Sequence, residues 1–138
     1  MGSVAIANLV SPYRRHIWLI AAPKSGSTWL GALLSEVLQW PSVPLLDCYD
    51  RREQEVDAWM LLKHPNEDIF TPHQHTRASQ PTLNIIHQFR IIPVVLVRNI
   101  FDSIISLHDH LFSESNIIPL AYFDRSFYEF DRDTQLSA

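Results

Sequence analysis

A lysine and three hydroxyl side chains surround one glycine in the stretch Lys24-Ser25-Gly26-Ser27-Thr28. The apolar run Ile17–Ala21 before it is typical of a buried parallel strand. Apolar residues recur at helical spacing after it, so the chain is predicted to pass from a strand through a tight turn into a helix. The first N–H groups of a helix have no partner within it, and the helix dipole places positive charge there. With the Lys24 charge and the hydroxyls, this stretch predicts a site for phosphate or sulfate.

The order of these residues excludes the common ATP-binding loop, Gly-x-x-x-x-Gly-Lys-Ser/Thr. In that loop the lysine follows the second glycine, whereas Lys24 precedes Gly26, and no glycine stands upstream to open such a loop. A strand-to-helix turn without a ligand is the simpler alternative, but a lysine and three hydroxyls exceed what a turn needs.

A second candidate for binding an anion follows the apolar run Ile91–Val97, which predicts another strand. Arg98 comes directly after this run, and Ser106 lies eight positions later on a predicted helix. Because ligands of open α/β sheets bind at the carboxyl ends of strands, we expect Arg98 to lie near the Lys24 loop. A guanidinium binds phosphate with paired donors, so two anion sites predict a ligand with two separated anionic groups. An ion pair with Asp102 is the alternative role for Arg98.

Both stretches resemble motifs of the sulfotransferases that use 3′-phosphoadenosine 5′-phosphosulfate (PAPS). Residues 23–30 resemble the 5′-phosphosulfate loop of that family, and residues 98–107 resemble its 3′-phosphate motif, Arg-Asn-Pro-x-Asp followed by a serine. Ile100 stands where the family usually has proline, which affects loop stiffness more than charge. The resemblance spans about residues 17–112 and implies an α/β fold, with a parallel β-sheet flanked by helices in a P-loop NTPase-like sulfotransferase architecture.

The resemblance also implies roles for individual residues. Lys24 is implied to be catalytic and to bind the PAPS co-substrate, while Arg98 and Ser106 hold its 3′-phosphate. No metal is implied, because lysine and backbone N–H groups supply the positive charge. The remaining residues implied to bind PAPS are Ser25, Gly26, Ser27, Thr28 and Trp29.

Sulfuryl transfer also needs a base that takes the proton of the acceptor, and histidine suits this near neutral pH. The family carries its histidine in a Lys-Thr-His-like element at the end of a strand, roughly two dozen residues before the 3′-phosphate arginine. His75 lies 23 positions before Arg98 and is therefore predicted to be the catalytic base. His73, which stands where the family often has lysine, is the alternative, and His108 and His110 can also approach an acceptor.

Length and composition set the broader limits. A chain of 138 residues holds one domain, predicted as residues 1–138. The family's C-terminal Arg-Lys-Gly-type element is missing, which predicts an N-terminal portion of a sulfotransferase. A net charge of −4 argues against a nucleic-acid partner. No run of about 20 apolar residues predicts a membrane span, and the single Cys48 excludes an internal disulfide. We therefore expect a cytoplasmic protein. Its expected partners are a small-molecule acceptor and, in a homodimer, a second copy of the chain.

The coarse order of elements is strand, helix, a weak region, strand, helix, strand and helix, which favours a parallel sheet flanked by helices. Arg14, Arg15 and His16 are expected to be solvated residues leading into the first strand. The other expected elements are a helix ending near Gln39–Pro41, a strand within Ile69–His75, a helix starting at Ser79–Thr82 and a helix over Asp102–Phe112.

Two other classes of function stay open at this point. A small-molecule kinase would need a magnesium-binding carboxylate beside the first loop, and none follows the first strand. A non-catalytic nucleotide-binding fragment of a sulfotransferase would bind the nucleotide without turnover. Magnesium-dependent ATP turnover would identify the first class, and nucleotide binding without sulfate transfer would identify the second.

Overall fold

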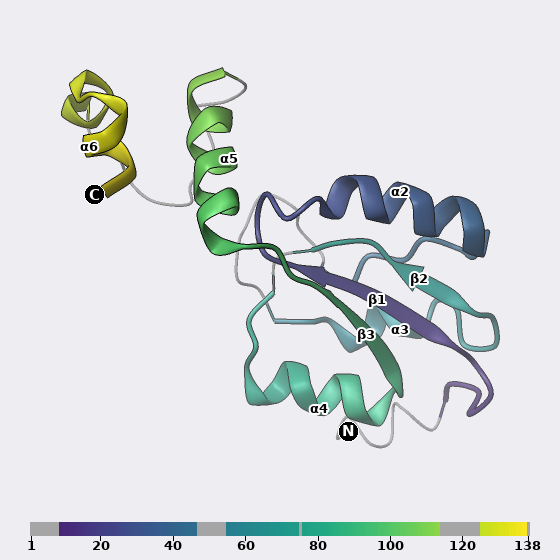
Figure 1. Cartoon of the computed structure of the whole chain (residues 1–138). Coiled ribbons are helices and arrows are strands. Elements are labelled where there is room, and N and C mark those ends of the chain that lie inside the picture. The colour runs from purple at the N-terminus through teal and green to yellow at the C-terminus, as the bar shows by residue number, and fades with distance from the viewer. Residues whose placement is uncertain (1–8, 47–54, 75, 114–124, 138) are drawn as a thin grey trace. The chain divides into compact units, whose positions relative to one another are not determined.

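The computed structural model describes residues 9–46, 55–74, 76–113 and 125–137, which form two compact units. The larger unit comprises Met1–Ala22 and Gly26–Val97, and the smaller unit comprises Pro23–Ser25 and Arg98–Ala138. The elements in chain order (Figure 1) are β1 (His16–Ala21), α2 (Ser27–Leu38), α3 (Ala58–Leu61), β2 (Ile69–Thr71), α4 (Gln80–Gln88), β3 (Ile91–Leu96), α5 (Ile100–Ser113), the 3-10 helix η1 (Arg125–Glu129) and α6 (Arg132–Ser137).

The larger unit is built on a three-stranded parallel sheet with the order β2-β1-β3. The residue pairs Trp18–Thr71 and Ala21–Leu96 set the register. Because β1 and β3 pair along their whole length, the chain leaves both strands at the same edge of the sheet. The prediction of a parallel α/β sheet flanked by helices is confirmed (Figure 1).

The two faces of β1 are covered by different helices. Trp18 is wholly buried and belongs to the main apolar cluster, against which Ile85 and Ile86 of α4 pack. Side chains alternate along a strand, so Leu19 points to the opposite face. There a Cβ added at Gly31 of α2 would lie 3.6 Å from the Leu19 side chain, which shows how closely this helix approaches the sheet.

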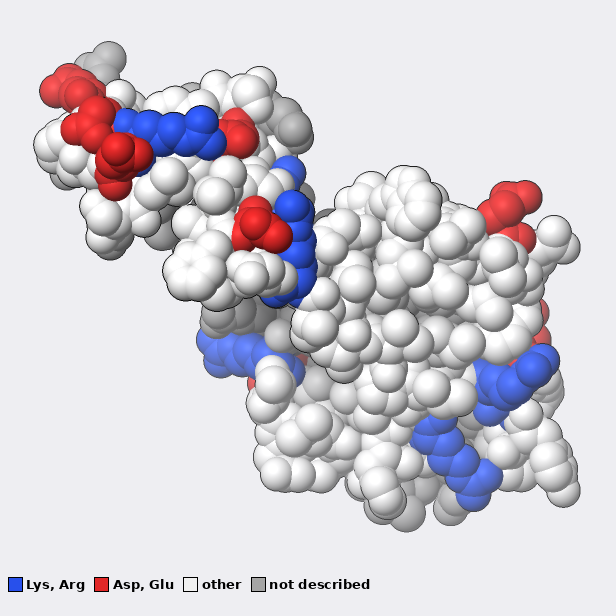
Figure 2. Space-filling model, in the orientation of Figure 1, with Lys and Arg blue, Asp and Glu red and all other residues white. Residues whose placement is uncertain are grey.

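Helix α2 presents only part of its apolar surface to the sheet. Leu30, Leu34 and Leu38 are half-buried, whereas the side chains of Trp29 and Val37 are 74% and 71% exposed. The apolar residues that recur at helical spacing along α2 are therefore divided between the sheet and the surface, because the helix contacts the sheet near Gly31. Uncharged residues dominate the face of the larger unit seen in Figure 2.

Strand β3 differs from the buried strand that its sequence predicts. It lies at an edge of the sheet, and the side chains of Ile92 and Val95 are 50% and 62% exposed. The position explains how Pro93 is accommodated, because a proline lacks the N–H group that an inner strand must donate. Among the described residues, β3 has β1 on one side and α4 against one face.

Two of the three basic residues that were expected to be solvated are buried. That expectation is therefore wrong for Arg14 and for His16, which is the first residue of β1. Arg14 is 6% exposed and His16 is wholly buried. His16 Nε2 lies 2.7 Å from Thr71 Oγ1, whose single proton is donated to the carbonyl oxygen of Val43 at 2.8 Å. Thr71 can therefore only accept from His16, which requires a proton on Nε2 of the imidazole.

Desolvation, with a smaller contribution from the nearby Arg14 charge, lowers the pKa of His16 from 6.5 to about 3. Between these values the unfolded chain binds a proton that the folded protein does not, so this group's contribution to stability is present above pH 6.5 and lost as the pH falls. We expect His16 to lower the free energy of unfolding by roughly 1.5–2 kcal/mol between pH 6.5 and about pH 5. His16→Gln still donates to Thr71 but does not titrate. In urea unfolding curves it should lack this decrease in the free energy of unfolding. An equal pH dependence in both proteins would contradict the assignment.

Helix α5 carries the polar and aromatic contacts that hold the smaller unit together. His108 stacks on Phe112 with ring centroids 4.6 Å apart, and its Nε2 lies 2.7 Å from Oε1 of Gln135 in α6. Gln135 in turn donates to the carbonyl oxygen of Phe127 at 2.8 Å. None of the helices in the described ranges has the length and apolar character needed to cross a membrane.

Candidate functional site

A pocket of about 350 Å³ lies in the smaller unit, along one side of α5. It combines two cationic side chains, two hydroxyls, two carboxylates and one histidine, with a single apolar residue. Its lining residues are Lys24, Arg98, Asp102, Ile105, Ser106, Asp109, His110 and Ser113.

The structure brings Lys24 and Arg98 together in this pocket. Arg98 NH1 donates a hydrogen bond of 3.0 Å to the carbonyl oxygen of Lys24. Lys24 has φ 60°, a left-handed conformation that costs a non-glycine residue roughly 1–2 kcal/mol. The alternative role considered for Arg98 was an ion pair with Asp102. Among the described residues no such ion pair is present. Strained backbone held by a second residue is a pattern that clusters at binding and catalytic sites.

Ser106 differs from the neighbouring serines of α5. The hydroxyls of Ser103 and Ser113 donate back to the helix carbonyls of Asn99 and Asp109, at 3.1 and 2.5 Å. Within the described part of the chain, the Ser106 hydroxyl has no such hydrogen bond. It therefore lines the pocket with both its donor and its lone pairs available to a ligand.

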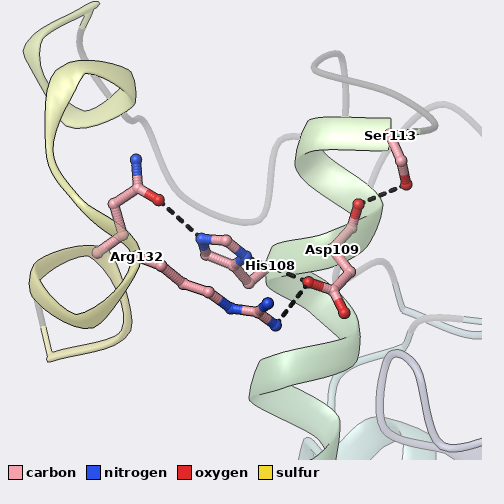
Figure 3. A network of polar contacts seen from close by, with 5 residues as sticks. His108, Asp109, Ser113 and Arg132 are labelled. Atoms are coloured by element: carbon pink, nitrogen blue, oxygen red, sulfur yellow. Dashed lines mark hydrogen bonds and ion pairs between the residues drawn. The ribbon is translucent and has the colours of Figure 1, made fainter.

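Two carboxylates of α5 reduce the net positive charge of the pocket. Asp109 forms an ion pair of 2.9 Å with Arg132 of α6, which both orients and neutralises it (Figure 3). Asp102 lies in the first turn of α5, where a negative charge complements the helix dipole. Since Arg132 offsets Asp109, the charges of Lys24 and Arg98 exceed the remaining carboxylate by one.

Three pocket residues, Asp109, His110 and Ser113, were not predicted as site residues from the sequence, which named only His110 as able to approach an acceptor. They follow Ser106 by three, four and seven positions, which is the spacing of one helix face. Extending the helical face that carries Ser106 would have found all three. His110 is half-buried in this pocket, so one of the histidines considered near an acceptor lies beside Lys24 and Arg98.

The start of α2 lies in the larger unit and has its own features. Its first helical hydrogen bond runs from the N–H of Leu30 to the carbonyl oxygen of Gly26, at 3.1 Å. The N–H groups of residues 27–29 therefore have no partner within the helix. Gly26 has φ 95°, and a Cβ there would meet nothing within 4 Å, so the backbone conformation rather than space favours glycine. Ser27 is buried, whereas Thr28 and Trp29 are exposed.

The predicted base, His75, lies outside the described residues, so its position stays a prediction. His73 is described and half-buried, two residues beyond the end of β2. Ser25 is buried in the loop between β1 and α2. No cluster of three or more histidine, cysteine or carboxylate side chains with the arrangement of a metal site occurs in the described ranges.

Comparison with known proteins gives one match. The family model described as the sulfotransferase domain matches residues 14–131, which include the Lys24 loop, Arg98 and the whole of α5. No curated protein matches the chain. No solved structure matches it either.

Proposed function

The chain belongs to the sulfotransferase domain family, and from this premise we propose that it transfers a sulfuryl group from PAPS to a hydroxyl or amine of a small-molecule acceptor. The observation that carries the proposal is the pocket in which Lys24, Arg98 and Ser106 lie together. Each of these residues has a donor suited to an oxyanion, and their sequence motifs agree with the family.

The side chains present fit a donor with two anionic groups. Arg98 and the available hydroxyl of Ser106 suit the 3′-phosphate. A guanidinium donates charge-assisted hydrogen bonds to phosphate oxygens, and a hydroxyl donates one more. Lys24 suits the 5′-phosphosulfate, and the amides at the start of α2, which have no partner within the helix, supply the same kind of donor. We assign the remaining contacts with the donor to Ser25, Gly26, Ser27, Thr28 and Trp29.

PAPS supplies the sulfuryl group, whose bond to the acceptor oxygen or nitrogen forms as its bond to the 5′-phosphate oxygen breaks. The proton of the acceptor must leave at the same time, and we assign its removal to His75. Negative charge builds up on the 5′-phosphate oxygen, which Lys24 stabilises by direct charge and hydrogen bonding. In this proposal His75 accepts the proton of the acceptor, and Lys24 offsets the negative charge on the departing 5′-phosphate.

Binding of the product nucleotide tests the proposal. Calorimetry should give a saturable heat when 3′-phosphoadenosine 5′-phosphate is added to the chain, and adenosine 5′-phosphate should bind at least ~10-fold more weakly without the charge-assisted contacts of the 3′-phosphate. Transfer of labelled sulfate from PAPS to a panel of phenols, alcohols and amines tests catalysis. Absence of both binding and transfer would refute the proposal, and binding without transfer would identify a non-catalytic module.

A comparison of His75→Ala with His73→Ala tests the assignment of the base. Loss of a general base lowers turnover by about 10²–10⁴-fold, so we expect His75→Ala to show this loss with nucleotide affinity within ~3-fold of the original. His73→Ala should retain most of the activity. If His73→Ala causes the larger loss, the base is the neighbouring histidine, and if nucleotide affinity collapses in His75→Ala, that residue is a ligand contact instead.

A further inference from the structure

The pocket along α5 contains a carboxylate that phosphate binding alone does not account for. Asp109 lines this pocket together with Arg98 and Ser106, the two residues assigned to the 3′-phosphate. A negative charge beside a phosphate opposes its binding, so Asp109 lowers the affinity of the pocket unless it also contacts another group of the ligand. The side chain of Asp109 is 56% exposed, so a ligand in the pocket can reach it.

Helix geometry places Asp109 close to Ser106. Residues three positions apart on a helix are neighbours, with about 5–6 Å between their Cβ atoms. Ser113, seven positions after Ser106, also lines the pocket, so the same face of α5 continues past Asp109. A ligand atom that contacts Asp109 therefore lies near a phosphate oxygen that contacts Ser106.

Arg132 of α6 binds one of the two carboxylate oxygens of Asp109. Its NH2 group donates to Oδ1 at 2.9 Å, and Nδ1 of His108 lies 3.5 Å from the same oxygen (Figure 3). Among the described residues, no hydrogen bond is donated to the other oxygen, Oδ2. The ion pair thus reduces the repulsion between Asp109 and a bound phosphate, and it leaves Oδ2 to accept a hydrogen bond from the ligand.

The position of Arg132 does not depend on this ion pair alone. Gln135, three positions later on α6, is 8% exposed, and its Oε1 lies 2.7 Å from Nε2 of His108. Its amide group also donates to the carbonyl oxygen of Phe127 at 2.8 Å. An exposed ion pair by itself contributes little, but these more buried contacts hold α6 beside α5 and so keep Arg132 near Asp109.

We propose that Oδ2 of Asp109 accepts a hydrogen bond from the 2′-hydroxyl of the nucleotide and so selects a ribonucleotide over a 2′-deoxyribonucleotide. The inference rests on the proposed function, because it takes the nucleotide to be bound through its 3′-phosphate. The 2′-hydroxyl is carried by the ribose carbon next to the one that bears the 3′-phosphate, so it is a donor close to the groups held by Arg98 and Ser106. Carboxylates recognise ribose hydroxyls in this way in dinucleotide-binding folds.

Calorimetry with 3′-phosphoadenosine 5′-phosphate and its 2′-deoxy analogue tests this role of Asp109. The 2′-deoxy analogue should bind the original protein about 10-fold more weakly, the usual effect of losing one hydrogen bond to a charged acceptor. Asp109→Ala should bind the two nucleotides with affinities within ~2-fold of each other. This variant should bind the 2′-deoxy analogue at least as tightly as the original protein does, because it loses a repelling charge and no contact.

Two further variants separate a contact from a general effect of charge. Glu129→Ala removes an exposed carboxylate of the same unit that does not line the pocket, and it should keep the 10-fold preference of the original protein. Arg132→Ala should weaken the binding of both nucleotides by about 3-fold at low ionic strength, because the charge of Asp109 is then uncompensated. Adding Asp109→Ala to Arg132→Ala should restore the affinity for the 2′-deoxy analogue.

The outcomes distinguish this inference from the proposed function. If the original protein binds both nucleotides equally, or if Asp109→Ala keeps the preference, the inference is overturned and the proposed function stands. It is also overturned if Asp102→Ala removes the preference, because the other carboxylate of the pocket is then the acceptor. If neither nucleotide binds at millimolar concentrations, the proposed function fails and this inference fails with it.

Discussion

Lys24→Ala should lower sulfuryl transfer by roughly 10²–10³-fold, the usual effect of removing one group that stabilises transition-state charge. The physical reason is that Lys24 offsets charge on the departing 5′-phosphate, which is fully developed only as the sulfuryl group leaves. Affinity for 3′-phosphoadenosine 5′-phosphate should fall much less, because Arg98 and Ser106 remain in the pocket. Steady-state transfer rates and calorimetry on the same variant measure the two quantities.

The matched variant Lys24→Arg keeps the positive charge and should retain more activity than Lys24→Ala. Lys63→Ala removes an exposed lysine of the larger unit that does not line the pocket, and it should leave transfer unchanged. A loss in Lys24→Ala that is equal for binding and transfer would show that Lys24 acts only in holding the nucleotide. Near-normal transfer would remove Lys24 from the mechanism altogether.

The local signals in the sequence predicted the parts of the fold that depend on neighbouring residues. The apolar run of β1, the turn at Gly26 and the helical spacing of α2 are all contained in one short stretch. The same holds for Arg98, which comes shortly before α5, and for Ser106 within that helix, because both also lie in one short stretch. These elements formed where the sequence predicted them because the pattern that marks each one is contained in its own residues.

The features that the sequence did not predict depend on partners far along the chain. The burial of His16 requires Thr71, and the burial of Arg14 requires carbonyl groups near Leu61, about 50 positions away. No local pattern distinguishes these residues from a solvated basic segment. The edge position of β3 has the same origin, because a strand's own residues do not record how many neighbours it has in the sheet.

Arg98→Ala should weaken binding of 3′-phosphoadenosine 5′-phosphate by roughly 10–100-fold, the range for losing charge-assisted hydrogen bonds to a phosphate. Arg98 has a second role in the structure, since it donates to the carbonyl oxygen of Lys24. A loss of affinity alone does not separate direct phosphate binding from support of the strained Lys24 backbone. A ligand that lacks the 3′-phosphate makes the separation.

Adenosine 5′-phosphate should bind the original protein and Arg98→Ala with affinities within ~3-fold of each other, because it offers Arg98 no 3′-phosphate. The two proteins and two ligands form a cycle in which the coupling free energy reports the contact between Arg98 and the phosphate. If both ligands lose affinity equally, Arg98 acts by holding Lys24 and the 3′-phosphate binds elsewhere. Arg98→Lys sharpens the distinction: a lysine keeps the charge but lacks the paired donors, so it should restore only part of the affinity for the bisphosphate.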